Sequence, residues 1–76
     1  MLKELDRVRI VKFLSGNRSY YGDESVKRSP RIGETGTIVH LVEKEGVVVG
    51  GVVEKTDAQG LTIWMADFAA DELKVC

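Results

Sequence analysis

The stretch that most constrains the fold of this chain is residues 33–42, which read GETGTIVHLV. Its two glycines stand three positions apart and open a run of β-branched and aliphatic residues. Glycine supplies the backbone freedom that a tight turn needs, and β-branched side chains favour extended structure. The stretch therefore predicts a tight turn that leads into a central β-strand.

The segment at residues 6–13 predicts a strand before the central one. Its charged and apolar side chains alternate, which is typical of a strand with one buried face. Val8 and Ile10 are expected inside, with Arg7 and Arg9 outside. A shift of one residue would bury the arginines, so the pattern specifies the register.

Two further apolar segments, residues 47–54 and 61–65, follow polar connectors that each end in glycine. They predict the remaining strands of a meander. Gly50 and Gly51 leave two interpretations open for the first segment: a turn between very short strands, or a bulge within one strand. A single bulged strand is preferred because triplets of valine alone make poor strands.

The end of the chain predicts one short element and a closing strand. Residues 66–73 fit a single helical or 3-10 turn, with Asp67 as its cap and with Phe68 and Leu73 facing inward. Residues 74–76 fit the closing strand.

The chain has 76 residues, enough for a single domain at 1–76. A domain of this size buries roughly 60% of its unfolded surface, so its core is small and a role that needs only a surface is favoured. Alternation places Leu61, Ile63 and Met65 inside, with Trp64 on the other side of the sheet. The expected core consists of Val8, Ile10, Val39, Leu41, Val48, Val52, Leu61, Ile63, Phe68 and Leu73.

Residues 15–31 are polar, contain two glycines and the only proline, and have neither a strand nor a helix period. They predict one long loop. Loops of this length inside compact domains are usually functional or disordered.

The order of these segments resembles that of small bacterial SH3-like barrels, including KOW-type barrels. The resemblance implies an all-β, five-stranded SH3-like barrel with a long first loop and one short helical or 3-10 turn before the last strand. Such barrels serve as ribosome, transcription-factor and enzyme-accessory modules. The matching positions are Asp6, Val8 and Ile10, the stretch 33–39, and the ending formed by Ile63, Trp64, Phe68, Glu72 and Leu73.

The chain departs from these families in two respects. The seventeen residues at 15–31 are an insertion relative to a compact KOW unit. The chain also lacks the Ala-Leu-Tyr-Asp-Tyr start and the pocket aromatics of signalling SH3 domains, so recognition of proline-rich peptides is not implied.

Catalytic and metal chemistry find little support in the sequence. His40 is the only histidine and Cys76 the only cysteine, and no third group is evident that would orient them as a pair. A single thiol forms no intramolecular disulfide and lacks the companions that a zinc site needs. We therefore expect no enzyme activity, no cofactor and no metal, in a cytoplasmic protein without a signal peptide or a membrane span.

Charge is distributed unevenly along the chain. Residues 1–32 carry a net charge of +4 and residues 33–76 a net charge of −5, within a total of −1. Two interpretations remain open: the fold presents one basic and one acidic face, or it interleaves the halves so that their fields cancel.

The loop holds the best candidates for binding, because basic and aromatic side chains alternate in it. Phosphates and bases of single-stranded nucleic acid bind such a mixture, and Tyr and Arg also dominate protein interfaces. A third interpretation has the tyrosines folding back over the barrel. The candidate residues are Arg18, Tyr20, Tyr21, Lys27, Arg28 and Arg31, together with Trp64 beneath or beside the loop.

The function expected from these features is a non-enzymatic protein-binding or accessory module that uses the 15–31 loop and the Trp64 side. The alternative is a KOW-like RNA- or ribosome-associated domain that binds phosphates through the basic loop. A homo-oligomer is also expected if residues 47–53 form an edge strand that pairs with its own copy.

Overall fold

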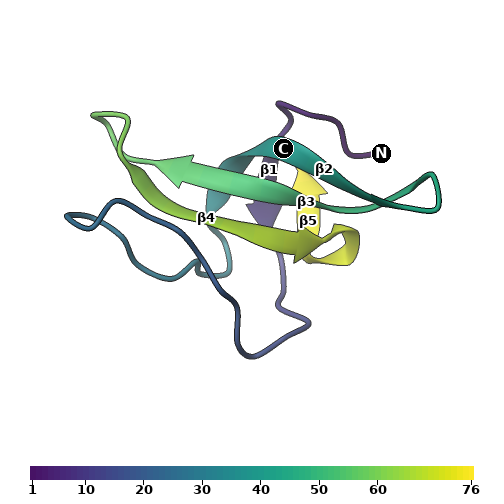
Figure 1. Ribbon diagram of the computed structural model, residues 1–76, viewed down its shortest axis with the longest axis horizontal. Coiled ribbons are helices and arrows are strands. Elements are labelled where there is room, and N and C mark those ends of the chain that lie inside the picture. The colour runs from purple at the N-terminus through teal and green to yellow at the C-terminus, as the bar shows by residue number, and fades with distance from the viewer.

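The computed structural model describes residues 1–76 as five β-strands and one 3-10 turn (Figure 1). This architecture confirms the all-β class, the long first loop and the short turn before the last strand. None of its elements is a helix long and apolar enough to cross a membrane. The elements are β1 (Arg7–Ile10), β2 (Thr35–Lys44), β3 (Val47–Thr56), β4 (Thr62–Ala69), η1 (Ala70–Glu72) and β5 (Leu73–Val75).

All five strands belong to one antiparallel sheet with the order β4-β3-β2-β1-β5. The first strand therefore lies between the second and the last, and β4 and β5 form the two ends of the sheet. No ladder joins β4 to β5, so closure into a barrel stays a prediction.

Strand β3 settles the interpretation of Gly50 and Gly51. It runs unbroken through both glycines, so the single-strand interpretation is confirmed. The register shift lies beside them at Val49, between the pairs Val42–Gly50 and Glu43–Val48. Gly50 serves close packing instead, because a Cβ atom there would overlap the carbonyl oxygen of Phe68 on β4.

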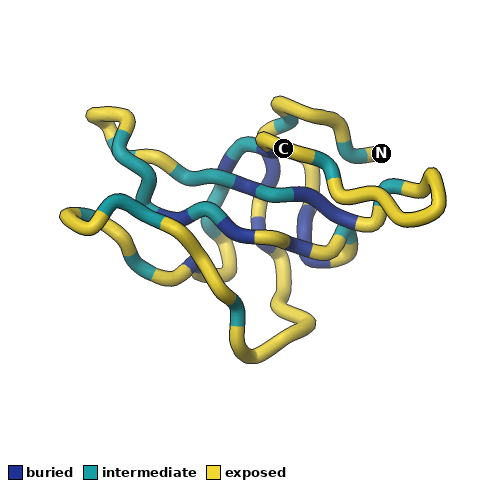
Figure 2. Tube along the Cα trace, in the orientation of Figure 1, coloured by how far each residue is buried: buried dark blue, intermediate teal, exposed yellow.

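The core is a single cluster of eight buried hydrophobic side chains. Figure 2 marks all buried residues along the chain in dark blue. The cluster confirms Val8, Ile10, Phe68 and Leu73. Leu41 and Ile63 are partly buried and pack against this cluster. The other four predicted residues lie outside it, so their assignment to the core is wrong; they are Val39, Val48, Val52 and Leu61. The residues missing from the prediction are Ile38, Val53, Trp64 and Ala66.

A bulge in β2 explains why Ile38 and not Val39 belongs to the core. Ile38 pairs with Val53, yet the next pair is His40 with Val52, so Val39 is an extra residue in its strand. An inserted residue reverses the in-and-out alternation on its strand. Ile38 before the bulge is buried and Leu41 after it packs against the core, whereas the extra residue Val39 is 39% exposed.

The side chains of β4 point to the opposite sides of the sheet from those expected. Register shifts at Ile63, because Lys55 pairs with Trp64 while Thr56 pairs with Thr62. Beyond this point the inward residues are Trp64, Ala66 and Phe68, and the Trp64 and Phe68 rings meet edge to face with centroids 5.8 Å apart. Burial of the two aromatic rings outweighs burial of the smaller alternating side chains.

The short turn is later and smaller than predicted. Residues 66–69 continue β4, and only Ala70–Glu72 form the 3-10 turn. Asp67 is exposed on the strand and does not cap the turn. Glu72 takes that role, since its Oε1 accepts a hydrogen bond from the backbone N–H of Ala69 at 2.8 Å.

Strand β3 does not offer the free edge that the predicted self-association requires. It pairs with β2 on one side and, from Gly50 onward, with β4 on the other. Only residues 47–49 lack a partner on the β4 side.

Candidate functional site

The long loop lies along the outer edge of β4 and is fixed there by its backbone. Tyr21 and Met65 exchange two backbone hydrogen bonds of 2.9 and 2.8 Å. The N–H of Asp23 donates to the carbonyl of Thr62 at 2.8 Å, and the N–H of Arg28 donates to the carbonyl of Ile63 at 3.1 Å. These bonds occupy much of the backbone edge that β4 presents at the end of the sheet, and they hold the loop close to its surface (Figure 1).

Arg18 anchors the first part of the loop to the end of β4. Its guanidinium forms an ion pair with Glu72 at 2.6 Å and lies 4.4 Å from the ring centroid of Phe68. Burial alone would raise the pKa of Glu72, but hydrogen bonds from Arg18 and from the N–H groups of Leu14 and Ala69 outweigh it and lower that pKa. Arg18 is therefore a structural cation, neutralised by a buried carboxylate.

Arg28 anchors the last part of the loop in the same way, through Glu34. Two guanidinium nitrogens bind the two carboxylate oxygens at 2.8 and 2.6 Å. The same carboxylate accepts hydrogen bonds from the backbone N–H of Arg31 at 2.8 Å and from the indole N–H of Trp64 at 3.2 Å. The Arg28 hydrogen bonds contribute most to lowering the pKa of Glu34 to about 2.

The remaining two basic candidates lie on the surface. Lys27 pairs with Glu24 at 2.9 Å, and this hydrogen bond raises the pKa of the lysine. Arg31 is exposed and its side chain forms no ion pair. Of the four basic residues proposed for the loop, only Arg31 thus lacks an acidic partner.

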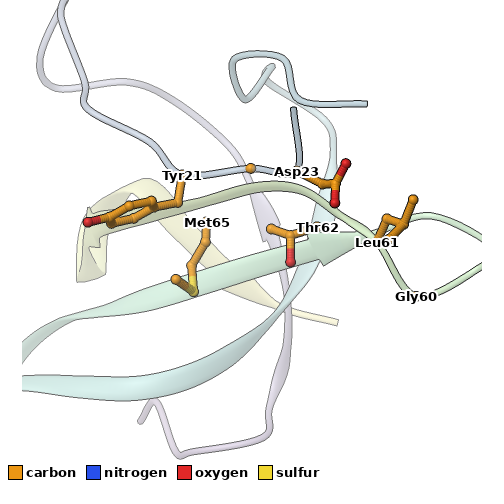
Figure 3. A pocket seen from close by; sticks show the side chains of 7 residues that line it. Tyr21, Asp23, Gly60, Leu61, Thr62 and Met65 are labelled. Atoms are coloured by element: carbon orange, nitrogen blue, oxygen red, sulfur yellow. The ribbon is translucent and has the colours of Figure 1, made fainter. Parts of the chain in front are cut away.

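Tyr20 and Tyr21 remain accessible, with 38% and 76% of their surfaces exposed. Two shallow hollows of about 410 and 440 Å³ flank them, and Tyr21 and Met65 line both. The first hollow extends to Leu61, and the second to Tyr20 and Val52. Figure 3 shows the Tyr21 ring and the Met65 side chain on adjacent segments, one on the loop and one on β4. We call Tyr20, Tyr21 and Met65 the tyrosine ridge.

The structure removes Trp64 from the predicted binding surface. Its side chain is fully buried, and its one polar atom is bound to Glu34. The residue that joins the tyrosines at the surface is its neighbour Met65, which the sequence pattern placed in the core. The reversed facing of β4 accounts for both changes.

Glu34 and Glu72 are the site residues that sequence reasoning missed. Glu34 stands between the two glycines of the turn, and its indole partner is Trp64, on another strand. Neither acid takes part in a periodic pattern. The one sequence signal for these two acids is the excess of cations in the loop, which requires acidic partners elsewhere in the fold.

The structure contains no group of three or more histidine, cysteine, aspartate or glutamate side chains that could hold a metal ion. His40 is exposed on β2, and Cys76 is an exposed free thiol. No protein-family model matches this chain, and neither a curated protein nor a solved structure shows detectable similarity to it.

Proposed function

We propose that this protein is a non-enzymatic protein-binding or accessory module that engages its partner through the 15–31 loop at the tyrosine ridge. The observation that supports the proposal is the exposure of Tyr20 and Tyr21 on a loop whose backbone is held to β4. Tyrosine has a large contact surface and few rotatable bonds, so a fixed tyrosine loses little entropy on binding. This combination is frequent at the energetic centres of protein interfaces.

The charge arrangement supports a protein partner over RNA at the loop. Arg18 and Arg28 are neutralised by Glu72 and Glu34, and Lys27 is paired with Glu24. Phosphate binding through these residues would have to break ion pairs that hold the loop in place. The KOW-like RNA-binding alternative is therefore our second candidate for this surface, with Arg31 as its remaining free cation.

We include the resemblance to small SH3-like barrels and a cytoplasmic location in the proposal. Cys76 is a free thiol, and a protein without disulfides is suited to a reducing compartment.

Selection of peptides tests this proposal without a known partner. A library of random peptides displayed on phage is selected against the protein, and enriched peptides are measured by fluorescence anisotropy. We expect peptides whose Kd rises about 30-fold in Tyr21→Ser, because truncation of a hot-spot tyrosine costs about 2 kcal/mol. Val47→Ser removes another exposed apolar side chain, which is 61% exposed against 76% for Tyr21 and lies away from the ridge, and it serves as the control.

Three results would contradict the proposal. The first is a selection that enriches no peptide, and the second is a set of peptides that bind Tyr21→Ser as well as they bind the native protein. The third is tight binding of a mixed-sequence single-stranded RNA that is lost in Lys27→Gln/Arg31→Gln, which would favour the RNA alternative at the loop. Chemical-shift changes confined to residues 18–31 would locate either ligand.

A further inference from the structure

A second surface, on the outer face of β1, carries cations that form no ion pair in the structure. Arg7 and Arg9 are exposed, while Val8 and Ile10 beside them are buried. Arg9 stands directly opposite Lys74 of β5 in the ladder. The three ion pairs of the structure all involve other cations.

The pairing of Arg9 with Lys74 has a cost for folding. Directly opposed residues of an antiparallel pair lie on the same face with close Cβ atoms, and like charges there destabilise the sheet. One Arg9 nitrogen donates to the carbonyl of Gly33 at 2.8 Å, which fixes the side chain but leaves its charge in place. Such an arrangement is accounted for if an anionic ligand occupies this face.

A small polar pocket continues the same charged surface toward β2 and β3. Its volume is about 50 Å³, and its lining contains no hydrophobic side chain. Arg7 and Lys55 line it, and each makes only a long hydrogen bond of 3.4 Å, to the hydroxyl and to the carbonyl of Thr35 respectively. The pocket also holds the carboxylate of Glu54, which accepts a hydrogen bond from the neutral hydroxyl of Thr62 and forms no ion pair with either cation. The two weakly held cations outnumber this one carboxylate, and together with the nearby threonine hydroxyls they suit a phosphate group.

We propose that Arg7, Arg9, Lys55 and Lys74, which we call the basic face, bind the phosphate backbone of a nucleic-acid duplex. This site is separate from the tyrosine ridge and does not depend on the function proposed there. No aromatic side chain stands among these four cations or lines the polar pocket, so the face offers cations for phosphates but no platform for unpaired bases. A duplex presents closely spaced phosphates and keeps its bases stacked inside, which matches this chemistry.

Fluorescence anisotropy with a labelled 16-base-pair DNA duplex of mixed sequence tests the proposal. Affinity is measured from low to moderate salt with native protein and with Arg9→Gln/Lys74→Gln. Four phosphate contacts predict a slope of log affinity against log salt of about −3.6, and loss of two predicts about −1.8. Lys3→Gln/Lys44→Gln removes the same charge from unpaired lysines off the basic face and should leave the slope unchanged. Arg9→Lys/Lys74→Arg keeps the charges and should also retain binding.

Each of four outcomes would overturn the proposal. They are an absence of binding at low salt, an equal loss in the Lys3/Lys44 control, stronger binding of the single strand than of the duplex, and displacement of the duplex by polyglutamate at equal charge concentration. The last would assign the basic face to an acidic polypeptide. Thermal melting followed by circular dichroism establishes that each variant is folded. If the double glutamine variant unfolds, Lys74→Gln alone keeps the test decisive, because loss of one phosphate contact predicts a slope of about −2.7.

Discussion

At the scale of single residues, Glu34 connects the loop, the turn and the core. One carboxylate holds the Arg28 side chain, the Arg31 backbone and the Trp64 indole. Because these bonds stabilise the ionised form, the pKa of Glu34 falls to about 2 from its ordinary value of 4.5. A group with a depressed folded-state pKa stabilises the protein above its unfolded pKa, and this contribution disappears as pH falls through the folded value.

We therefore predict that the free energy of unfolding decreases between about pH 4.5 and pH 2. The loss attributable to Glu34 is about 3 kcal/mol, because its pKa is lowered from 4.5 to about 2 and each pKa unit corresponds to about 1.4 kcal/mol. Glu72, whose pKa is also lowered, adds to the loss in the same direction. Urea titrations at a series of pH values measure the effect.

The variant Glu34→Gln distinguishes the source of this pH dependence. It should lower stability by about 2 kcal/mol at neutral pH, because hydrogen bonds to charged partners are lost. It should also remove most of the decline in acid. Glu24→Gln, at the exposed pair with Lys27, should change stability by less than about 0.5 kcal/mol. An equal effect of the two variants would contradict the role given to Glu34.

At the scale of elements, Gly50 allows β3 and β4 to approach each other. An added methyl group would meet the backbone of Phe68, which cannot turn away as a side chain can. We predict that Gly50→Ala costs about 3 kcal/mol, measured by urea unfolding. Gly16→Ala is the control, since nothing lies within 4 Å of its added Cβ, and it should be neutral. Equal stability of both variants would show that the strands adjust without cost.

The elements also show how far the sequence alone leads. Alternation predicted β1 correctly at Val8 and Ile10, because this strand is short and has no bulge. In β2 and β4 the bulges at Val39 and Ile63 interrupted the alternation, and apolar side chains on both faces of these strands conceal such a change of register. The exposed tyrosines could be predicted from the loop sequence. The roles of Glu34 and Glu72 could not, because each depends on a partner far away in the chain: Trp64 lies 30 positions from Glu34, and Arg18 lies 54 positions from Glu72.

At the scale of the whole molecule, the two proposed surfaces differ in their effect on the stability of the fold. The tyrosine ridge rests on a loop that the fold secures, whereas the basic face retains repulsion between Arg9 and Lys74. We predict that Lys74→Glu stabilises the protein by about 0.5 kcal/mol, because a repulsive cross-strand pair becomes attractive. The same variant should weaken duplex binding and leave peptide binding at the ridge unchanged. Urea unfolding and the two anisotropy assays measure these effects, and a loss of stability would contradict the account of this pair.

The position of β1 between β2 and β5 also matters while the protein is being made. Ile10 pairs with Leu73, which is 63 positions further along the chain. At about 5–20 residues per second, a ribosome needs roughly 3 to 13 s to add that segment. During this interval the edge of β1 that later pairs with β5 has no partner, and unpaired edges of this kind associate with other nascent chains. We expect Arg7 and Arg9, which are exposed on this strand and repel other cationic edges, to limit aggregation of the unfinished protein before any ligand reaches it.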